Sequence, residues 1–158
     1  MDESNQLFCA LRQLWVKASP EELIRQSWIQ TLISKLAYPL ATMAVEKSLH
    51  QIPHLAYNSA HLPRRRADLI IFAKDIHPTY SLYPLLLIEC KATPLNARVM
   101  RQVVGYNFYL QAPFIATVNQ NEARLGWYDS QQQKFCFTEG ILPYKTLFEA
   151  ARQRLNLK

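Results

Sequence analysis

The sequence predicts one α/β domain in which helices flank a mixed β-sheet. Short apolar runs, several of them rich in β-branched residues, alternate with longer segments of helical periodicity. The 158 residues fit a single domain, which we place over residues 1–158, with an N-terminal extension over 1–18 and a core over about 19–156. Because 49% of the residues are hydrophobic and no internal repeat occurs, a packed core is favoured over disorder or a solenoid.

The first helix has a clear N-terminal signature. Ser19 is placed as N-cap, Pro20 as the first helical residue and Glu22 at the capping-box position. Apolar residues then recur at near-helical spacing: Leu23, Trp28, Leu32, Ile33 and Leu36. The helix is expected to end around Ala37, because Pro39 follows.

The remaining elements follow from the same periodicities. Three strands are expected over residues 41–49, 67–73 and 83–92. A helix is then expected over residues 97–112, ended by Pro113. Three further strands and a last helix complete the chain, over residues 114–118, 124–129, 134–138 and 144–155. This order of elements predicts a mixed sheet with helices packed against it.

Charge and cysteine content bound the class of protein. Lys and Arg outnumber Asp and Glu by 18 to 12, and a net charge of +6 is compatible with a polyanionic partner without establishing one. The three cysteines have no CxxC spacing, which predicts reduced thiols and a cytoplasmic protein. No signal peptide or long apolar segment occurs, so we expect no membrane association.

A pair of acidic residues stands out when the second and third strands are joined as a hairpin. With the turn centred between residues 78 and 79, Ile70 pairs with Leu87, and Asp68 faces Glu89. Directly opposed residues place their Cβ atoms about 5 Å apart on one face of the sheet. The period of two sends Glu89 and Lys91 to that face and Cys90 to the other.

Two facing carboxylates repel each other unless a cation compensates them. Mg²⁺ or Mn²⁺ suits oxygen ligands, and we expect Asp68, Glu89 and the backbone carbonyl of Cys90 to hold it, with water completing the shell. Lys91 would lie beside the ion, where it orients an attacking water or stabilises a transition state of phosphodiester hydrolysis. The competing interpretation is a solvated strand end with a salt bridge worth under ~1 kcal/mol.

Three segments in order, "RRRADLIIF", "PLLLIECKA" and "QVVGYNFYLQAPFIATVN", resemble a known family. It is the N-terminal nuclease domain of type I restriction enzyme R (HsdR) subunits, a branch of the PD-(D/E)xK nuclease superfamily. The similarity runs from about Pro20 to Phe148. It implies a restriction-endonuclease-like fold with an αβββαβ core and a Mg²⁺- or Mn²⁺-dependent DNA endonuclease activity.

The resemblance also assigns residues. It implies metal-binding and catalytic roles for Asp68, Glu89 and Lys91, with Gln102 and Tyr106 as the Q-x-x-x-Y motif of the following helix. Glu22 matches an acidic residue that the superfamily often keeps on its first helix. The competing interpretations are a half-buried Tyr106 with a satisfied hydroxyl and a Glu22 that serves only the capping box.

Three arginines, Arg64, Arg65 and Arg66, directly precede Asp68 and are expected to meet the phosphates of the nucleic acid, although a solvated charge run is the alternative. Glu46 is interpreted as an ordinary strand-edge residue. The chain departs from its relatives near Asn119, where "TVNQNEARLG" replaces a polar turn of "TNG" type, so the cleft wall there is expected to differ.

No G-x-x-x-x-G-K-[ST] motif occurs, so we expect a free-standing nuclease-like domain rather than a restriction motor. DNA is the expected substrate, and a helicase or specificity subunit is the kind of protein partner the resemblance suggests. A homodimer stays open, because nucleases that cut both strands are commonly dimeric. The alternatives to catalysis are a non-catalytic nucleic-acid-binding or assembly module and a domain that binds only proteins.

Overall fold

A six-stranded mixed sheet forms the centre of the computed structural model, which describes residues 5–156 apart from the side chains of residues 58 and 59. The strands lie in the order β3-β4-β5-β6-β7-β8, and only β5 and β6 are parallel. Their bounds are β3 (Met43–Ser48), β4 (Arg66–Lys74), β5 (Leu82–Cys90), β6 (Phe114–Val118), β7 (Ala123–Asp129) and β8 (Lys134–Glu139). The predicted fold class is confirmed.

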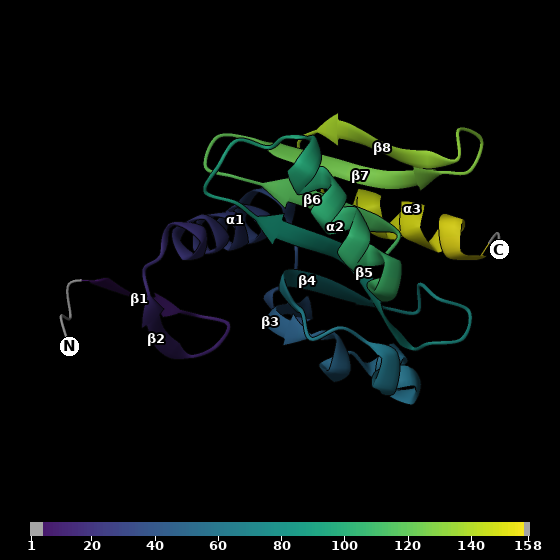
Figure 1. Cartoon of the computed structure of the whole chain (residues 1–158), viewed down its shortest axis with the longest axis horizontal. Coiled ribbons are helices and arrows are strands. Elements are labelled where there is room, and N and C mark those ends of the chain that lie inside the picture. The colour runs from purple at the N-terminus through teal and green to yellow at the C-terminus, as the bar shows by residue number, and fades with distance from the viewer. Residues whose placement is uncertain (1–4, 157–158) are drawn as a thin grey trace.

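Three α-helices cover the sheet (Figure 1). Their bounds are α1 (Pro20–Leu36), α2 (Ala97–Leu110) and α3 (Tyr144–Asn156). Residues of α1 and α3 share one buried cluster with one face of the sheet, and residues of α2 share a second cluster with the opposite face. Three 3₁₀ helices, η2 (Leu40–Thr42), η3 (Leu49–Gln51) and η4 (Pro53–His61), occupy the connections around β3.

The N-terminal extension is not irregular where the structure describes it. It forms a two-stranded antiparallel hairpin of β1 (Gln6–Cys9) and β2 (Leu14–Lys17), which lies beside the start of α1 and outside the main sheet (Figure 1). The Phe8 and Trp15 rings meet edge to face across the hairpin, with centroids 5.7 Å apart. Such a pair contributes to a hairpin that is too small to be stable alone.

Helix α1 begins as the sequence predicts. The Ser19 hydroxyl accepts a hydrogen bond from the Glu22 amide, and Pro20 is the first helical residue. The prediction that Leu23 belongs to the buried stripe of α1 was wrong, because this side chain is 53% exposed. Ile24 and Ile29, each one residue further along, provide the buried contacts. Near-helical spacing leaves the buried face uncertain by one position.

The β4–β5 hairpin has the predicted register. Ile70 pairs with Leu87, and the ladder keeps this register from Leu69 to Ile71. A bulge then shifts it at Phe72, which pairs with Pro84. Proline has no amide hydrogen for a ladder, so an irregularity is expected beside it.

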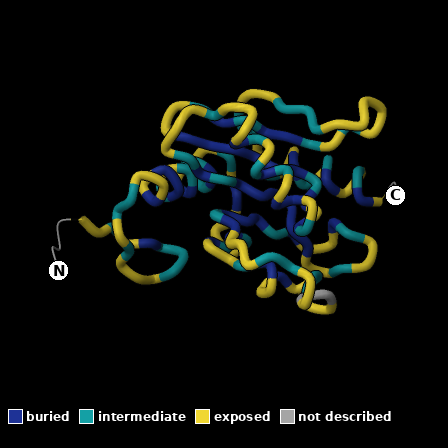
Figure 2. Tube along the Cα trace, in the orientation of Figure 1, coloured by how far each residue is buried: buried dark blue, intermediate teal, exposed yellow. Residues whose placement is uncertain are grey.

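The two faces of β5 are buried in different clusters. Leu87 packs with the α2 cluster, whereas Cys90 packs with the α1 and α3 cluster. The central strands are buried along most of their length, and exposure is concentrated in the loops and the hairpin tips (Figure 2). Within residues 5–156, no helix combines the length and hydrophobicity that crossing a membrane requires.

Two glycines offer a matched test of this packing. A Cβ at Gly126 would lie 2.6 Å from Cε1 of Phe137 and 3.0 Å from Cγ1 of Ile115, so Gly126→Ala should lower the free energy of unfolding by about 1–3 kcal/mol. A Cβ at Gly105, in α2, would meet no neighbouring atom of the described residues within 4 Å, and Gly105→Ala should raise the free energy of unfolding by about 0.5–1 kcal/mol. Urea denaturation measures both changes, and equal effects would contradict this packing.

Candidate active site

The Asp68 carboxylate joins three elements of the fold. Its Oδ2 accepts a hydrogen bond from the Cys90 amide at 2.8 Å, which links β4 to β5. Its Oδ1 lies 3.1 Å from Nη2 of Arg25, which links β4 to α1. The backbone ladder between β4 and β5 ends at Leu69, so the side chain of Asp68 replaces the next backbone contact. The carboxylate is therefore held in a fixed position, with 23% of the side chain exposed.

Glu89 lies at the end of β5 beside Asp68. Burial and the nearby Asp68 carboxylate raise the pKa of Glu89. Lys91, whose Nζ lies 3.0 Å from Glu89 Oε1, acts in the opposite direction. The side chains of Glu89 and Lys91 are 22% and 26% exposed. The structure thus brings together the three predicted residues at one partly accessible point, with two carboxylates close enough to disfavour each other's charge.

Glu22 also reaches this region, but not as the capping box suggests. Its backbone amide binds Ser19, whereas its carboxylate Oε2 lies 2.6 Å from Nη1 of Arg25. Arg25 is also 3.5 Å from Oε1 of Glu46. Glu46 does lie on the edge strand β3, and its half-exposed carboxylate also joins this ion-pair group.

The backbone explains how Glu46 reaches α1. Its φ of 49° is left-handed, an uncommon conformation for a residue other than glycine. The β3–β4 ladder pairs Val45 with Leu69 and Lys47 with Ala67 and skips Glu46 and Asp68. This local irregularity lies at the same level of the sheet as the acidic pair, and irregular strand positions often redirect a side chain near functional sites.

Two further arginines, Arg25 and Arg12, complete the group. Arg25 is 5% exposed in its side chain, and Arg12, from the turn of the β1–β2 hairpin, has Nη2 3.3 Å from Glu22 and 3.4 Å from Glu46. A signal for Arg25 existed, since Glu22, Arg25, Ile29 and Leu32 follow helical spacing and place two charges on the buried stripe. No local sequence signal pointed to Arg12, because its contacts with Glu22 and Glu46 join separate elements of the fold.

Tyr106 lies on α2 beside the acidic pair. Burial raises its pKa to about 12, the Arg65 guanidinium acts in the opposite direction, and the charges of Glu89 and Asp68 reach the phenol as well. Its hydroxyl donates to the Lys47 carbonyl at 3.4 Å, so the alternative of a satisfied buried tyrosine is also compatible with the geometry. Gln102 lies one turn earlier on α2 and is half-buried.

The arginine run lies next to this tyrosine. Arg64, Arg65 and Arg66 are all exposed, and the Arg65 guanidinium lies over the Tyr106 ring at 5.7 Å from its centroid. Stacking on an aromatic ring orients a guanidinium while leaving its edge available to an anion. Of the three arginines, Arg65 is thereby held near the acidic pair.

Asn119 closes the turn between β6 and β7. Its Oδ1 accepts from the amides of Asn121 and Glu122, and its Nδ2 donates to the Thr93 carbonyl at 3.2 Å. Trp28 of α1 donates to the Asn119 carbonyl at 2.8 Å. This turn is thereby fixed against both α1 and the loop that follows β5.

The donors that could hold a metal ion are few. Among the described residues, no three His, Cys, Asp or Glu side chains are grouped so as to hold one. The set expected from the sequence is two carboxylates, Asp68 and Glu89, with the backbone carbonyl of Cys90. Thr117 pairs with Glu89 across the β5–β6 ladder, and its Oγ1 is buried without a hydrogen-bond partner in the described part of the chain. Hard oxygen donors and an unpaired hydroxyl fit an ion that keeps several waters.

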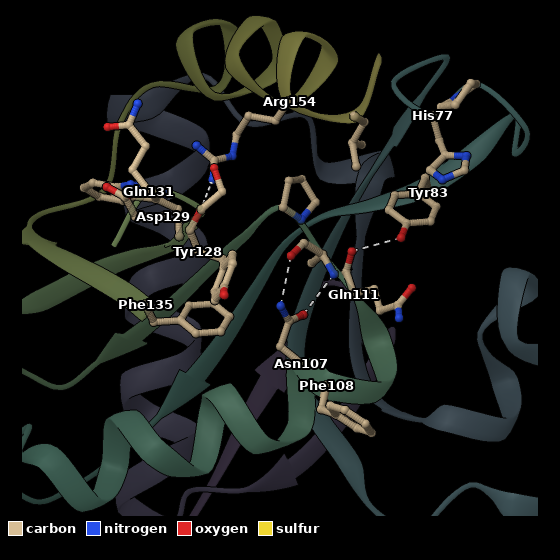
Figure 3. Close-up of a pocket in the computed structure, with 16 residues that line it drawn as sticks. His77, Tyr83, Asn107, Phe108, Gln111, Tyr128, Asp129, Gln131, Phe135 and Arg154 are labelled. Carbon is tan, nitrogen blue, oxygen red and sulfur yellow. Dashed lines mark hydrogen bonds between the residues drawn. The ribbon is translucent and has the colours of Figure 1, made fainter. Parts of the chain in front are cut away.

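A separate pocket of about 840 Å³ lies at the other end of the sheet (Figure 3). It is bounded by the C-terminal ends of α2 and α3 and by the β7–β8 hairpin, with Tyr128, Phe135 and Arg154 among its lining residues. Several of its polar groups already have partners: Arg154 donates to the Tyr128 carbonyl, and the Asn107 amide bonds to Ala112. It contains none of the predicted catalytic residues.

The fold and the site together define a class. A mixed sheet flanked by helices, with an acidic pair and a lysine at the ends of adjacent strands, is the architecture of a restriction-endonuclease-like, nuclease-like domain. The family model described as the type I restriction enzyme R protein N terminus matches residues 20–141, and the chain belongs to this family. No curated protein and no solved structure matches this chain.

The raised pKa of Glu89 predicts a pH dependence for the metal-free protein. Because the folded-state pKa lies above the ordinary value of 4.5, the stability associated with protonated Glu89 is complete below that value. It is lost as the pH rises through the folded-state pKa. We therefore compare the free energies of unfolding of Glu89→Gln and wild type in a chelating buffer. The value for the variant minus the value for wild type should increase as the pH rises from the ordinary pKa to the folded-state pKa, and then level off. Urea denaturation from about pH 4 to about pH 8 measures this, and a constant difference would contradict it.

Proposed function

We propose that the domain is a metal-dependent DNA endonuclease that hydrolyses phosphodiester bonds. The observation that carries the proposal is the meeting of Asp68 and Glu89, at the ends of adjacent strands, with the Lys91 ammonium 3.0 Å from Glu89. Membership in the family of type I restriction enzyme R protein N termini supports DNA as the substrate. Hydrolysis of a phosphodiester requires charge stabilisation at such a point.

Mg²⁺ or Mn²⁺ is the proposed cofactor, held by Asp68, Glu89 and the backbone carbonyl of Cys90. When bound, such an ion polarises a phosphoryl oxygen and lowers the pKa of a coordinated water. Binding also relieves the repulsion between the two carboxylates, because a divalent cation favours their charged forms. The raised pKa of Glu89 in the metal-free protein supports this role.

The chain's own residues provide position and charge. The Cys90 amide and Arg25 fix the two oxygens of Asp68, so that the carboxylate does not need to reorganise. Lys91 is 26% exposed and would stabilise negative charge on the phosphate as the leaving oxygen departs. Tyr106 and Gln102 line the same face of α2, where the phenol and the amide would orient a phosphate or a water.

The DNA strand is proposed to approach along Arg64, Arg65 and Arg66. All three are exposed, and Arg65 is oriented by its contact with Tyr106 close to the acidic pair. Contacts of this kind position the backbone and carry no sequence information. A helicase or specificity subunit, or a second copy of the chain, would then select the site of cleavage.

A non-catalytic nucleic-acid-binding or assembly module is the second candidate, and one observation favours it. Asp68 is paired with Arg25 and Cys90, and Glu89 is paired with Lys91, so both carboxylates have partners without a metal. A module of this kind would bind DNA in a salt-dependent manner, with no effect of divalent ions and no turnover.

Cleavage assays separate the two candidates. Purified protein should cut supercoiled and linear DNA in the presence of Mg²⁺ or Mn²⁺. Glu89→Gln or Lys91→Met should reduce the cleavage rate at least about 100-fold, because each removes a group that stabilises the reaction electrostatically. Glu149→Gln is a matched control, since Glu149 is an exposed acid on α3. It should retain wild-type activity.

Metal-dependent cleavage that persists equally in Glu89→Gln would assign the activity to a contaminant or to another site. Absence of cleavage together with metal-independent DNA binding would favour the second candidate.

Arg65 offers a test of the DNA path. Arg65→Ala should weaken DNA binding uniformly across sequences and reduce the slope of log affinity against log salt by about 1, because one phosphate contact is lost. Fluorescence anisotropy over a salt series measures the slope. Arg152→Ala, which removes an exposed arginine from α3, should leave the slope unchanged. A reduced slope in Arg152→Ala alone would place the DNA on another face.

A further inference from the structure

One guanidinium touches three carboxylates from three elements. Arg25 of α1 has Nη1 2.6 Å from Glu22 and 3.5 Å from Glu46 of β3, and Nη2 3.1 Å from Asp68 of β4. Its side chain is 5% exposed, the lowest value among the charged partners of Asp68 and Glu89. A buried arginine with three acidic partners is a fixed positive charge, because arginine does not lose its proton in proteins.

The charges are arranged in an order. Glu22 and Glu46 share Arg25 and also Arg12, which lies 3.3 and 3.4 Å from them. Asp68 contacts Arg25 and is also a neighbour of Glu89. Within the described part of the chain, Glu89 forms an ion pair with Lys91 and none with an arginine. Four carboxylates therefore divide into three that contact an arginine and one, Glu89, whose ion pair in the described part of the chain is with Lys91.

We propose that Arg25 stands in place of a second divalent cation, so that the site takes one ion, between Asp68 and Glu89, and Arg25 acts as a positioning residue for Asp68. This inference rests on the proposed function. A second ion beside Glu22 and Glu46 would have to displace a guanidinium that is already bonded to both of them and to Asp68.

The electrostatics support this division. Glu22, Glu46 and Asp68 all lie within 3.5 Å of the Arg25 guanidinium, so a positive charge already stands at the centre of this group. The same carboxylates would attract a divalent ion if the guanidinium were absent. Removing the arginine charge should therefore leave Glu22 and Glu46 able to hold a second ion, while removing Glu46 should not affect the ion held by Asp68 and Glu89.

Counting bound Mn²⁺ tests the inference without relying on activity. Electron paramagnetic resonance of free Mn²⁺ during titration should give one bound ion per wild-type chain. Glu46→Gln changes an acid that is 45% exposed in its side chain and keeps Arg25, so it should also bind one ion with unchanged affinity. Asp68→Asn should abolish that binding.

Arg25→Met removes the charge at similar length and should bind a second Mn²⁺. Its melting temperature should also fall in chelator and recover with Mn²⁺ by a larger shift than in wild type. Arg12→Met is the matched control, because Arg12 contacts Glu22 and Glu46 but not Asp68, and it should bind one ion.

The outcomes distinguish the inference from the proposed function. Two ions on the wild-type chain would overturn the role of Arg25 while leaving a metal-dependent nuclease in place. No bound ion would remove the proposed function itself. Loss of Mn²⁺ binding in Glu46→Gln would show that Glu46 is a ligand and would overturn the division, whether or not Arg25→Met folds.

Discussion

The contact on which the site depends is the double engagement of one carboxylate. Asp68 accepts the Cys90 amide with one oxygen and the Arg25 guanidinium with the other, and so it fastens β4 to both β5 and α1. It also stands where the backbone ladder between β4 and β5 ends, so a side chain continues the connection between the strands. Position and charge at the site are therefore set by the same interaction.

The surrounding charges explain how acidic groups are tolerated at this depth. Moving charges out of water is costly, and attraction between them compensates only when the geometry and additional hydrogen bonds are favourable. Arg25 provides such geometry for Glu22 and Asp68, which come from elements far apart in the sequence. Among the described residues Glu89 has only Lys91 as a close counter-charge, and burial together with Asp68 raises its pKa. The uneven compensation marks the part of the cluster where an additional cation would be most favourable.

The apolar sheet supplies the rigid platform for these polar groups. Leu87 and Ile88 are at most 1% exposed and pack on opposite faces, so the strand that ends in Glu89 is clamped from both sides. A strand fixed in this way presents its last residues with little freedom, which favours a preorganised site over one that forms on binding.

Much of this arrangement could be predicted from the sequence. Proline positions and periodicity indicated the elements, because they act locally on the backbone. The register of β4 and β5 followed from the turn position, and the period of two then separated Glu89 from Cys90. These are properties of neighbouring residues, which one sequence contains.

The remainder depended on contacts between distant segments. Glu46 joins the ion-pair group from a left-handed backbone conformation, which its residue type does not predict. Leu23 was placed on the wrong side of α1, because apolar residues surround much of that helix and a helical period tolerates a shift of one residue. Arg25 was overlooked although it lies on the buried stripe, since a charged residue there has meaning only once its partners on other strands are known.

The small hairpin at the N-terminus has a consequence for how the domain is delimited. The family match begins at residue 20, yet Arg12 reaches across from the turn between β1 and β2 to Glu22 and Glu46. A shortened protein that starts at the boundary of the match would keep every acidic side chain of the cluster and lack one of its two arginine counter-charges. The edge of a recognisable sequence pattern is thus not the edge of the electrostatic unit.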